Sequence, residues 1–443
     1  MLRRGDLWER AGAAARELVA AGVGPGDRVA IAIPNRWEFV AAALGSWTLG
    51  ATVAPVDILL KAEERAALLA DLEPKTTVSE VRPARGQQPE LVPPTGPALI
   101  LYTSGSTGRP KGAVLSHAAI AFAVDSWRGP VMALSPDDVV LAVLPFAHSF
   151  GLNGALLAPL LSGARVALVE RFSAEAVLDA IERHRVTVFP GVATMFRRVL
   201  DSPRLGTTDL SSLRIGVSGA APCPWDLACE WRERTGVRIV RGYGMTELFR
   251  PISYLAEDPR DLADAIGLPV PGVEVAIVED DGRPAPAGGV GELWIKTPAA
   301  MDTYLDAPEE TREVLENGWF KTGDLASLTE DGFVRIVGRK RERILRGGYS
   351  VFPQEVEAML LTHPAVAEAA VVGLTHPELG EEVAAFVSLR RGSACRGDAL
   401  VAYCKERLAV FKYPRTVTVM EALPRGATGK ILKSRLRSET ARG

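Results

Sequence analysis

A loop rich in hydroxyl groups and glycines lies between two short apolar segments, and it limits the fold more than any other stretch. Residues 97–101 are predicted to form a buried strand, and residues 113–115 are a second apolar run. The loop at residues 102–112 reads Tyr-Thr-Ser-Gly-Ser-Thr-Gly-Arg-Pro-Lys-Gly. Glycines let a backbone curl around a ligand, and consecutive N–H groups in such a turn form a nest for anions. With the charges of Arg109 and Lys111, the loop is predicted to bind a polyphosphate.

This loop does not match the Walker A pattern, which is another phosphate-binding loop. A Walker A loop needs Gly-Lys-Ser/Thr at the start of a helix, whereas here Pro110 separates the last loop glycine from Lys111. A flexible Gly/Ser linker is the alternative, but linkers do not usually join two apolar strands.

Length and composition set the broad class. A chain of 443 residues with 47% hydrophobic content is expected to form two or three domains with sizeable cores. The net charge of −3 gives no indication of nucleic acid or of an anionic membrane as a partner. The four cysteines lack the spacing of a metal site, so we expect reduced, mostly packed thiols in a cytoplasmic protein. Residues 39–60 are long enough to span a bilayer, but glycines and Pro55 interrupt them, which favours a buried helix at 37–49 followed by a buried strand.

The order of predicted elements indicates an α/β protein. Asp6 is expected to cap a helix that ends near residue 21, and helices and strands then alternate through residue 80, which is typical of parallel sheets. A second α/β run, with a helix at 154–161, extends to residue 217. Antiparallel strands follow at 267–298, with residues 280–282 as a hairpin turn, and a compact α+β unit begins near residue 342.

Six motifs in order resemble those of the acyl-adenylate-forming superfamily, which includes acyl-CoA synthetases, adenylation domains of peptide synthetases and beetle luciferases. The resemblance covers essentially the whole chain. The motifs are residues 102–112, 145–151 (Pro-Phe-Ala-His-Ser-Phe-Gly), 241–247 (Arg-Gly-Tyr-Gly-Met-Thr-Glu), 318–324 (Gly-Trp-Phe-Lys-Thr-Gly-Asp), 338–343 (Gly-Arg-Lys-Arg-Glu-Arg) and 423–431 (Leu-Pro-Arg-Gly-Ala-Thr-Gly-Lys-Ile).

The resemblance implies a division of the chain into two domains. Residues 1–340 would form a large N-terminal domain of two α/β sheet layers plus a small β-barrel, with the ATP and acyl sites. Residues 341–443 would form a small α+β lid that carries the catalytic lysine. The region before the first sheet and the connection at residues 82–96 are shorter than is usual in the family.

The resemblance also implies an ATP site. Tyr243 would stack on adenine, Asp324 and Arg339 would hold the ribose, and Glu247 would supply the hard oxygen that Mg²⁺ needs beside phosphates. The residues expected to bind ATP or AMP are Thr103, Ser104, Gly105, Ser106, Thr107, Gly108, Lys111, Gly219, Ala220, Tyr243, Gly244, Asp324 and Arg339.

Catalytic and acyl-site residues follow from the same motifs. The expected catalytic residues are Lys430, His148, Thr246 and Glu247. The acyl pocket is expected to include Val192, Met195, Ala221 and Gly242. No Asp occurs at residues 145–151, where amino-acid-activating relatives use one to hold the substrate's ammonium, so the substrate is expected to lack an α-amine.

The lid is expected to move about Arg341 and to bring Gly347 and Gly348 close to the pantetheine of CoA. Arg341, Arg343 and Arg346 are candidates to meet the CoA phosphates. Arg250 departs from the small residues that usually follow the motif at 241–247. It either pairs with a nearby acid or faces solvent, or it recognises a second carboxylate on the substrate.

The expected activity is that of an ATP-dependent acyl-CoA synthetase. A fatty or aryl acid would be activated as acyl-AMP with release of pyrophosphate and then transferred to the CoA thiol, with ATP, Mg²⁺ and CoA as cofactors. Two alternatives stay open: a ligase that loads the acyl group onto a carrier protein, and a non-catalytic adenylate-binding regulator. A small-molecule acid is the expected partner, and the oligomeric state, a homodimer included, stays open.

Overall fold

The computed structural model describes residues 2–82, 90–93, 96–103, 110–347, 349–425 and 431–440, without the side chains of 434 and 438–440. Contacts divide the chain into two compact units. Unit 1 comprises residues 1–275, 295–321 and 332–334, and unit 2 comprises residues 276–294, 322–331 and 335–443. The domain boundary at 340/341 stays a prediction, since this division also assigns parts of residues 276–331 to the C-terminal unit.

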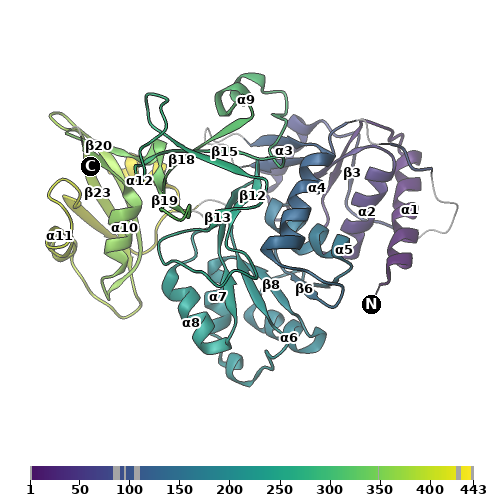
Figure 1. Cartoon of the computed structure of the whole chain (residues 1–443), viewed down its shortest axis with the longest axis horizontal. Helices are drawn as coiled ribbons and strands as arrows, with labels where there is room; N and C mark the ends of the chain where they lie inside the picture. Colours follow the sequence, from purple (N-terminus) through teal and green to yellow (C-terminus); the bar gives the residue numbers. More distant parts are fainter. Residues whose placement is uncertain are drawn as a thin grey trace. The chain divides into compact units, whose positions relative to one another are not determined.

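The first sheet of unit 1 carries the predicted phosphate loop. Its strands are β1 (Arg28–Ile31), β2 (Thr52–Pro55), β3 (Thr76–Val78), β4 (Leu99–Thr103), β5 (Lys111–Leu115) and β16 (Thr303–Tyr304), in the order β16-β5-β4-β2-β1-β3. β1 to β4 run parallel, whereas β5 returns antiparallel to β4. The helices of this part are α1 (Arg4–Ala20), α2 (Trp37–Thr48) and α3 (Ala62–Leu72), and α1 and α2 lie side by side (Figure 1).

The second sheet of unit 1 is entirely parallel, as the apolar strand runs predicted. Its strands are β6 (Val139–Ala142), β7 (Arg165–Leu168), β8 (Val188–Gly191), β9 (Ile215–Ser218) and β10 (Arg238–Val240), in the order β10-β9-β8-β6-β7. Its helices are α4 (His117–Ser126), α5 (Ala158–Ser162), α6 (Ala174–His184), α7 (Ala193–Leu200) and α8 (Trp225–Thr235). Phe189 of the sheet, Phe196 of α7 and Trp231 of α8 meet in one buried aromatic cluster.

Two further sheets follow, and they include strands at residues 267–298, as predicted. A three-stranded sheet contains β11 (Gly242–Met245), β12 (Phe249–Ser253) and β13 (Leu268–Pro269). A five-stranded sheet contains β14 (Glu274–Val278), β15 (Gly291–Lys296), β17 (Leu315–Glu316), β18 (Trp319–Leu328) and β19 (Val334–Arg339), and α9 is Pro308–Val314. The predicted turn after β14 is present: Gly282 donates its N–H to Glu279 O and has φ of 85°.

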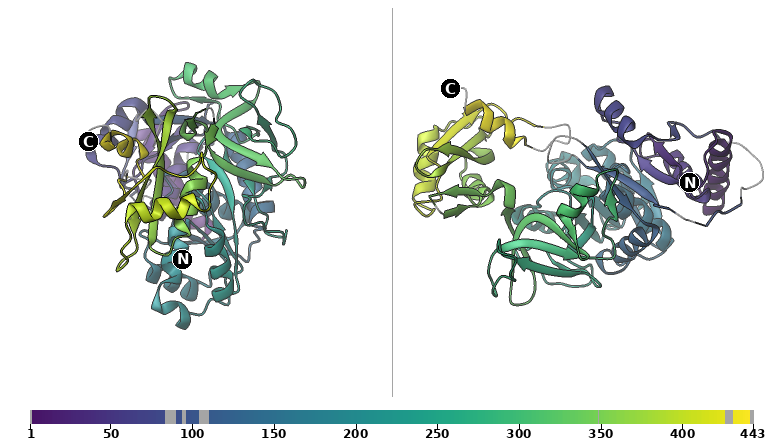
Figure 2. Two further views of the ribbon diagram at one scale, coloured as in Figure 1. Left: turned by 90° about the vertical axis from the view of Figure 1, so that its left-hand side faces the viewer. Right: turned by 90° about the horizontal axis from the view of Figure 1, so that it is seen from above.

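The C-terminal part of unit 2 is the green to yellow portion of Figure 2 and has the predicted α+β order. Its elements are β20 (Ile344–Arg346), β21 (Tyr349–Val351), α10 (Pro353–Leu361), β22 (Val366–His376), β23 (Gly380–Leu389), α11 (Gly397–Lys405), β24 (Thr416–Met420) and α12 (Lys433–Thr440). Alternate residues of β22 enter two cores. Val371 packs with α10 and α11, whereas Ala370 and Val372 pack with Leu436 of α12.

The helix predicted at residues 154–161 is present but has two parts, a π-helical stretch, η2 (Phe150–Leu157), and α5, which begins at Ala158. A continuous apolar run does not distinguish these helix types, and π turns are frequent at functional sites. Asp6 lies within α1 rather than before it. Its carboxylate accepts the N–H of Arg3 at 2.9 Å, so it still satisfies the helix N-terminus.

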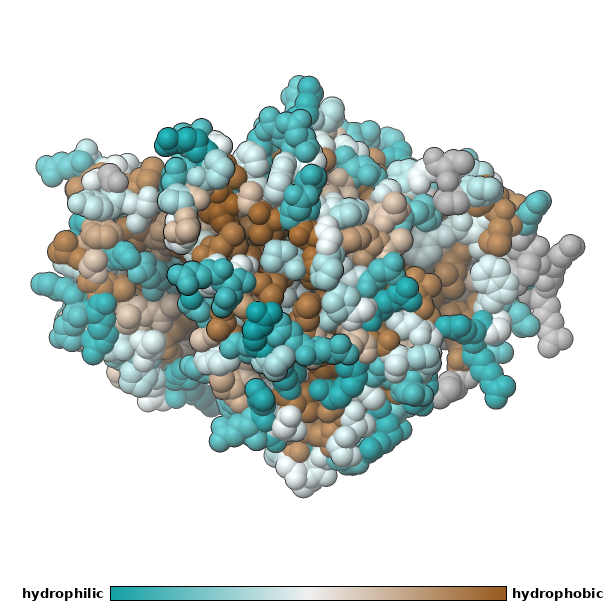
Figure 3. Space-filling model, in the orientation of Figure 1, coloured by the Kyte–Doolittle hydropathy of each residue, from teal (hydrophilic) through white to brown (hydrophobic). Residues whose placement is uncertain are grey.

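The thiols are free, but fewer are packed than expected. Cys404 is buried and Cys229 is exposed, while Cys223 and Cys395 are intermediate. On the face in Figure 3, polar side chains are spread widely, with hydrophobic ones in patches between them, which is normal for protein surfaces. Within the described ranges, no helix has the length and apolarity that crossing a bilayer requires.

Candidate active site

Buried Asn35 fixes the loop that leads from β6 to His148. Its amide nitrogen donates to the carbonyl oxygens of Ala142 (3.2 Å) and Leu144 (2.8 Å), and its Oδ1 accepts the N–H of Phe146 at 3.0 Å. Asn35 is 5% exposed and follows β1 of the first sheet. One side chain therefore satisfies three backbone groups of a loop that belongs to the other sheet.

His148 stands half exposed at the end of this loop. Its Nε2 lies 3.1 Å from Oδ2 of Asp57, and Oδ1 of Asp57 accepts the N–H of Leu59 at 2.9 Å. The hydrogen bond with His148 holds the pKa of Asp57 below its ordinary value. Asp57 is therefore ionised at neutral pH and orients the imidazole of His148.

Gly151, the last residue of this motif, is required by crowding. A Cβ there would collide with the carbonyl oxygens of Pro145 and Leu144, the second at only 2.7 Å. The start of η2 thus packs directly against the loop that precedes it. This close packing constrains the backbone on both sides of His148.

Tyr304 contacts both Lys111, which is predicted to bind the phosphates of ATP, and Glu247, which is predicted to bind Mg²⁺ beside them. Its hydroxyl donates to Oε1 of Glu247 at 2.8 Å, and the Nζ of Lys111 lies 5.2 Å from its ring centroid, within the range of a cation–π interaction. Burial, followed by the negative charge of Glu247, raises the pKa of Tyr304. Tyr304 therefore stays a hydrogen-bond donor and fixes the Glu247 carboxylate.

The motif at 241–247 forms β11 and the turn into β12. Tyr243 and Thr246 are half-buried, as is Glu247. At Gly244 an added Cβ would overlap the carbonyl oxygen of Phe249. The close pairing of β11 with β12 therefore explains why residue 244 is a glycine. A role of Gly244 in binding ATP stays a prediction.

Unit 2 brings together the two residues predicted to hold ribose. Nε of Arg339 lies 3.0 Å from Oδ1 of Asp324, whose side chain is almost fully buried, whereas that of Arg339 is 43% exposed. The backbone N–H of Asp324 donates to Oγ1 of Thr322 at 3.1 Å. Asp324 thus has a fixed, almost fully buried carboxylate beside the partly exposed Arg339, and its role toward the ribose hydroxyls stays a prediction.

The residues predicted for the acyl pocket gather at the carboxyl ends of the second sheet. Val192 and Met195 follow β8, Ala221 follows β9, and Gly242 follows β10. Ala220, also after β9, has the left-handed φ of 62°. Ligands of open α/β sheets bind at this edge, and the acyl-pocket role of these residues stays a prediction. Met195 is partly buried and also packs on the core of the sheet.

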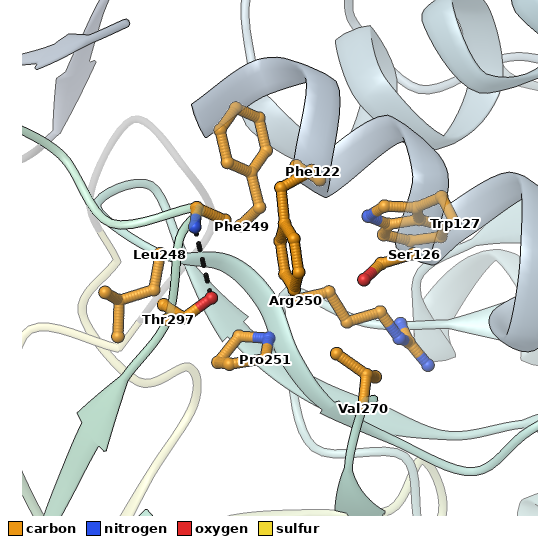
Figure 4. Close-up of a pocket in the computed structure, with 11 residues that line it drawn as sticks. Phe122, Ser126, Trp127, Leu248, Phe249, Arg250, Pro251, Val270 and Thr297 are labelled. Carbon is orange, nitrogen blue, oxygen red and sulfur yellow. Dashed lines mark hydrogen bonds between the residues drawn. The ribbon is translucent and has the colours of Figure 1, made fainter. Parts of the chain in front are cut away.

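Arg250 pairs with no acidic side chain among the described residues and does not face solvent, so the first interpretation of this residue was wrong. It is 5% exposed, and its guanidinium lies 5.0 Å from the ring centroid of Trp127. Figure 4 shows its side chain between Trp127 and Val270. On the side of Arg250 that faces Phe122, Leu248 and Val270, the space among the side chains has no room for a water molecule, and neither Gly219 nor Gly242 lines this space.

Near the predicted hinge, most charges are already paired. Arg343 binds Asp280 (3.0 Å) and Arg346 binds Glu382 through two contacts (2.6 and 3.1 Å), so binding CoA phosphates would require both to exchange partners. Arg341 is exposed in the short helix η4 (Lys340–Glu342). Gly347 has φ of 55°, which suits a tight turn.

Several predicted site residues lie outside the described residues. These are Ser104, Gly105, Ser106, Thr107, Gly108, Gly348 and Lys430.

Glu247 fits Mg²⁺ held jointly with a phosphate substrate. No group of three or more His, Cys, Asp or Glu side chains in the described ranges is arranged to hold a metal. Mg²⁺ in nucleotide sites commonly uses one or two carboxylates plus phosphate oxygens. Tyr304 occupies one oxygen of Glu247, and the other is left for such a bond.

Comparison with known proteins agrees with these motifs. The family profile described as "AMP-binding enzyme" matches residues 4–90 and 78–305, and that described as "AMP-binding enzyme C-terminal domain" matches residues 355–430. A feruloyl-CoA synthase from an Amycolatopsis species is 36% identical over 98% of the chain and 92% of its own length. A long-chain-fatty-acid–CoA ligase of Yersinia pestis is 33% identical over 82% of the chain and 65% of its own length. The crystal structure of ATP-bound MatB from Rhodopseudomonas palustris superposes with a TM-score of 0.89 at 32% identity, over 98% of this chain and 93% of that one.

Proposed function

The chain belongs to the AMP-binding enzyme family, and from this premise we propose that it forms an acyl-adenylate and then an acyl-CoA with the residues described above. An AMP-forming acyl-CoA synthetase activity, with ATP and CoA as substrates, is supported by the relatives named as CoA ligases. The observation that carries the proposal is the connected set Lys111, Tyr304 and Glu247, because Lys111 offers a cation to the phosphates and Tyr304 fixes the Glu247 carboxylate, which would hold Mg²⁺ beside them.

The first half-reaction joins two anions. An oxygen of the acid attacks the α-phosphorus of ATP, the new P–O bond forms acyl-AMP, and pyrophosphate leaves. Because the barrier is largely electrostatic, fixed positive charge lowers it. Lys111 and the loop at residues 103–108 would bind the phosphates, with Lys430 as a further cation. Mg²⁺, when bound through Glu247, would neutralise phosphate charge.

His148 would position the acid. Its imidazole is oriented by Asp57 and stands at the same sheet edge as the predicted acyl pocket. Asp324 and Arg339 would hold the ribose. The second half-reaction needs only a thiolate to attack the acyl carbonyl and displace AMP, so no protein nucleophile is required.

A panel of carboxylic acids with ATP and Mg²⁺ tests the proposal. We expect pyrophosphate release with at least one acid, and with free CoA a thioester plus AMP. Pyrophosphate release with transfer only to a phosphopantetheine carrier would instead indicate the carrier-loading alternative. Binding of AMP without pyrophosphate release from any acid would indicate the regulator and overturn the proposal.

A further inference from the structure

We propose that Arg250 determines substrate specificity by pairing with a second carboxylate of the acid, so that the enzyme prefers dicarboxylic acids. This inference rests on the proposed function and deepens it. It starts from the position of the guanidinium, which lies at the carboxyl ends of β9 and β10, where the predicted acyl-pocket residues also gather.

Two glycines keep space for this guanidinium. A Cβ at Gly219 would lie 2.9 Å from Nη1 of Arg250, and a Cβ at Gly242 would overlap the guanidinium itself. The same Gly219 Cβ would lie 3.2 Å from the ring of Phe150, the first residue of η2. The guanidinium is therefore among the segments predicted to surround the acid.

The hydrogen bonds of Arg250 leave part of its donor capacity unused. Nε donates to Oγ of Ser253 (3.0 Å), Nη1 to the carbonyl of Ser218 (2.9 Å) and Nη2 to the carbonyl of Val240 (3.2 Å). A guanidinium has five N–H groups, so one hydrogen on each terminal nitrogen has no such acceptor among the described residues. Two hydrogens on neighbouring nitrogens match the two oxygens of a carboxylate.

The charge of Arg250 is also uncompensated. Burial lowers its pKa to about 9, so the side chain is still largely cationic at pH 7. The part of the chain that the structure describes provides no carboxylate within ion-pair distance of it. An unpaired buried charge is costly, and it is usually retained where a partner arrives from outside.

Arg241 provides the contrast within the same chain. It is equally buried, at 5% exposure, but its Nη2 lies 2.5 Å from Oδ1 of Asp261 and it also binds the carbonyls of Leu262 and Ala263. Its charge is thus balanced by the protein. The protein supplies a carboxylate partner for Arg241, whereas among the described residues it supplies none for Arg250.

The test uses pairs of acids with the same carbon skeleton, in which the distal group is a carboxylate, an amide or a methyl group. The full chain is assayed for kcat/KM of pyrophosphate release, as wild type and as Arg250→Gln and Arg250→Lys. We expect the wild type to prefer the best dicarboxylic acid over its methyl counterpart by about 100-fold or more, since a site built for a polar group rejects the analogue that lacks it. Arg250→Gln should remove most of this preference, and Arg250→Lys should keep part of it.

Arg241→Gln is the matched control, because it removes a buried arginine that the protein itself pairs. It should lower the thermal unfolding temperature yet keep the preference between the acids. If Arg250→Gln does not fold, the unfolding temperature of the wild type tests the inference instead. In the presence of ATP, the dicarboxylic acid should raise this temperature more than its amide or methyl counterpart. Equal or better use of the amide or methyl acids by the wild type would overturn the inference but leave the proposed function standing. Failure of every acid would overturn the proposed function.

Discussion

His148 and Asp57 form a hydrogen bond of 3.1 Å between loops that follow strands of different sheets. Asp57 comes two residues after β2 of the first sheet, and His148 comes six residues after β6 of the second. Asn35 spans the same two sheets through its bonds to Ala142, Leu144 and Phe146. The position of the imidazole is therefore set by the packing of two sheets rather than by its own loop.

Asp57→Asn should weaken use of the acid, because it removes the charge that orients His148 while keeping the shape of the side chain. We expect kcat/KM for the acid to fall by about tenfold, which is equivalent to about 1.4 kcal/mol. Steady-state pyrophosphate release over a range of acid concentrations measures it. Unchanged kinetics in a folded variant would show that Asp57 does not position His148.

The difference in stability between the wild type and Asp57→Asn should depend on pH. Because the pKa of Asp57 is lowered in the folded state, its contribution is fully present above its unfolded value of about 3.9 and is lost as pH falls through the lower folded value. Wild type and Asp57→Asn should thus differ in the free energy of unfolding at pH 6 and converge towards pH 3. Urea titrations at several pH values provide this comparison.

Tyr304→Phe should lower the rate of adenylate formation, because Glu247 loses the donor that fixes one of its oxygens. The phenyl ring would still face Lys111. We expect a loss of about 1 kcal/mol in stability from the hydrogen bond and a several-fold higher Mg²⁺ requirement. Tyr254→Phe is the control, since it removes a similar bond, of 3.1 Å to the carbonyl oxygen of Leu262, at a residue outside the predicted ATP site. An equal change in the Mg²⁺ requirement of both variants would contradict the assignment.

Elements with strong local patterns were predictable from sequence. The strand predicted at residues 97–101 overlaps β4, and the helix predicted at 37–49 is α2, because the pattern of apolar residues is a local property. The fold class is confirmed as mixed α/β with a large N-terminal part and a C-terminal part. The motifs also led to the correct family.

Residues whose role depends on distant partners were missed. Asp57 and His148 are 91 positions apart, Asn35 and Phe146 are 111 apart, and Tyr304 and Glu247 are 57 apart. No sequence motif marks Asp57, Asn35 or Tyr304. For Asn35 and Asp57 a weaker signal exists, because each is a polar residue just past a parallel strand. The burial of Arg250 was missed for the same reason, since Ser218 and Val240 belong to other strands.

Gly151→Ala should destabilise the fold, because the added methyl group would overlap two backbone carbonyl oxygens that have little freedom to move. We expect a loss of about 2 kcal/mol or more in the free energy of unfolding. Gly206→Ala is the matched control: a Cβ there meets nothing within 4 Å, and the change should stay within about 0.5 kcal/mol. Denaturant titration of both variants measures the difference, and equal stabilities would contradict the crowding argument.

Lys430→Ala should separate the two half-reactions. If the lysine acts only while two anions meet, its loss should reduce pyrophosphate release by several orders of magnitude but change transfer from synthetic acyl-AMP to CoA by less than about tenfold. Quenched-flow assays of each step provide the measurement. Equal loss of both steps would argue against a lysine that serves adenylation alone.

Lys433 connects the start of α12 to the region of the predicted hinge. Its Nζ lies 2.7 Å from Glu342, the residue after Arg341, and 2.8 Å from Glu357 of α10. Burial raises the pKa of Glu342, but the charge and hydrogen bond of Lys433 outweigh this and hold the pKa below its ordinary value. Since Lys433 is only three residues after Lys430, the pair of contacts anchors the end of the segment that carries the predicted catalytic lysine.

Lys433→Met should therefore leave two carboxylates close together without their shared cation. We expect a loss of about 1 kcal/mol or more in stability at pH 7, because the two ion pairs are only partly buried, with side chains 16–26% exposed. The loss should shrink as pH falls, because the wild-type stabilisation present above the unfolded pKa of Glu, about 4.3, disappears as Glu342 is protonated. The double variant Lys433→Met/Glu342→Gln should recover part of the stability, since it removes one of the two unpaired charges. Adenylation by Lys433→Met should fall more than transfer from synthetic acyl-AMP. A folded variant with both half-reactions intact would show that this anchor does not position the lysine segment.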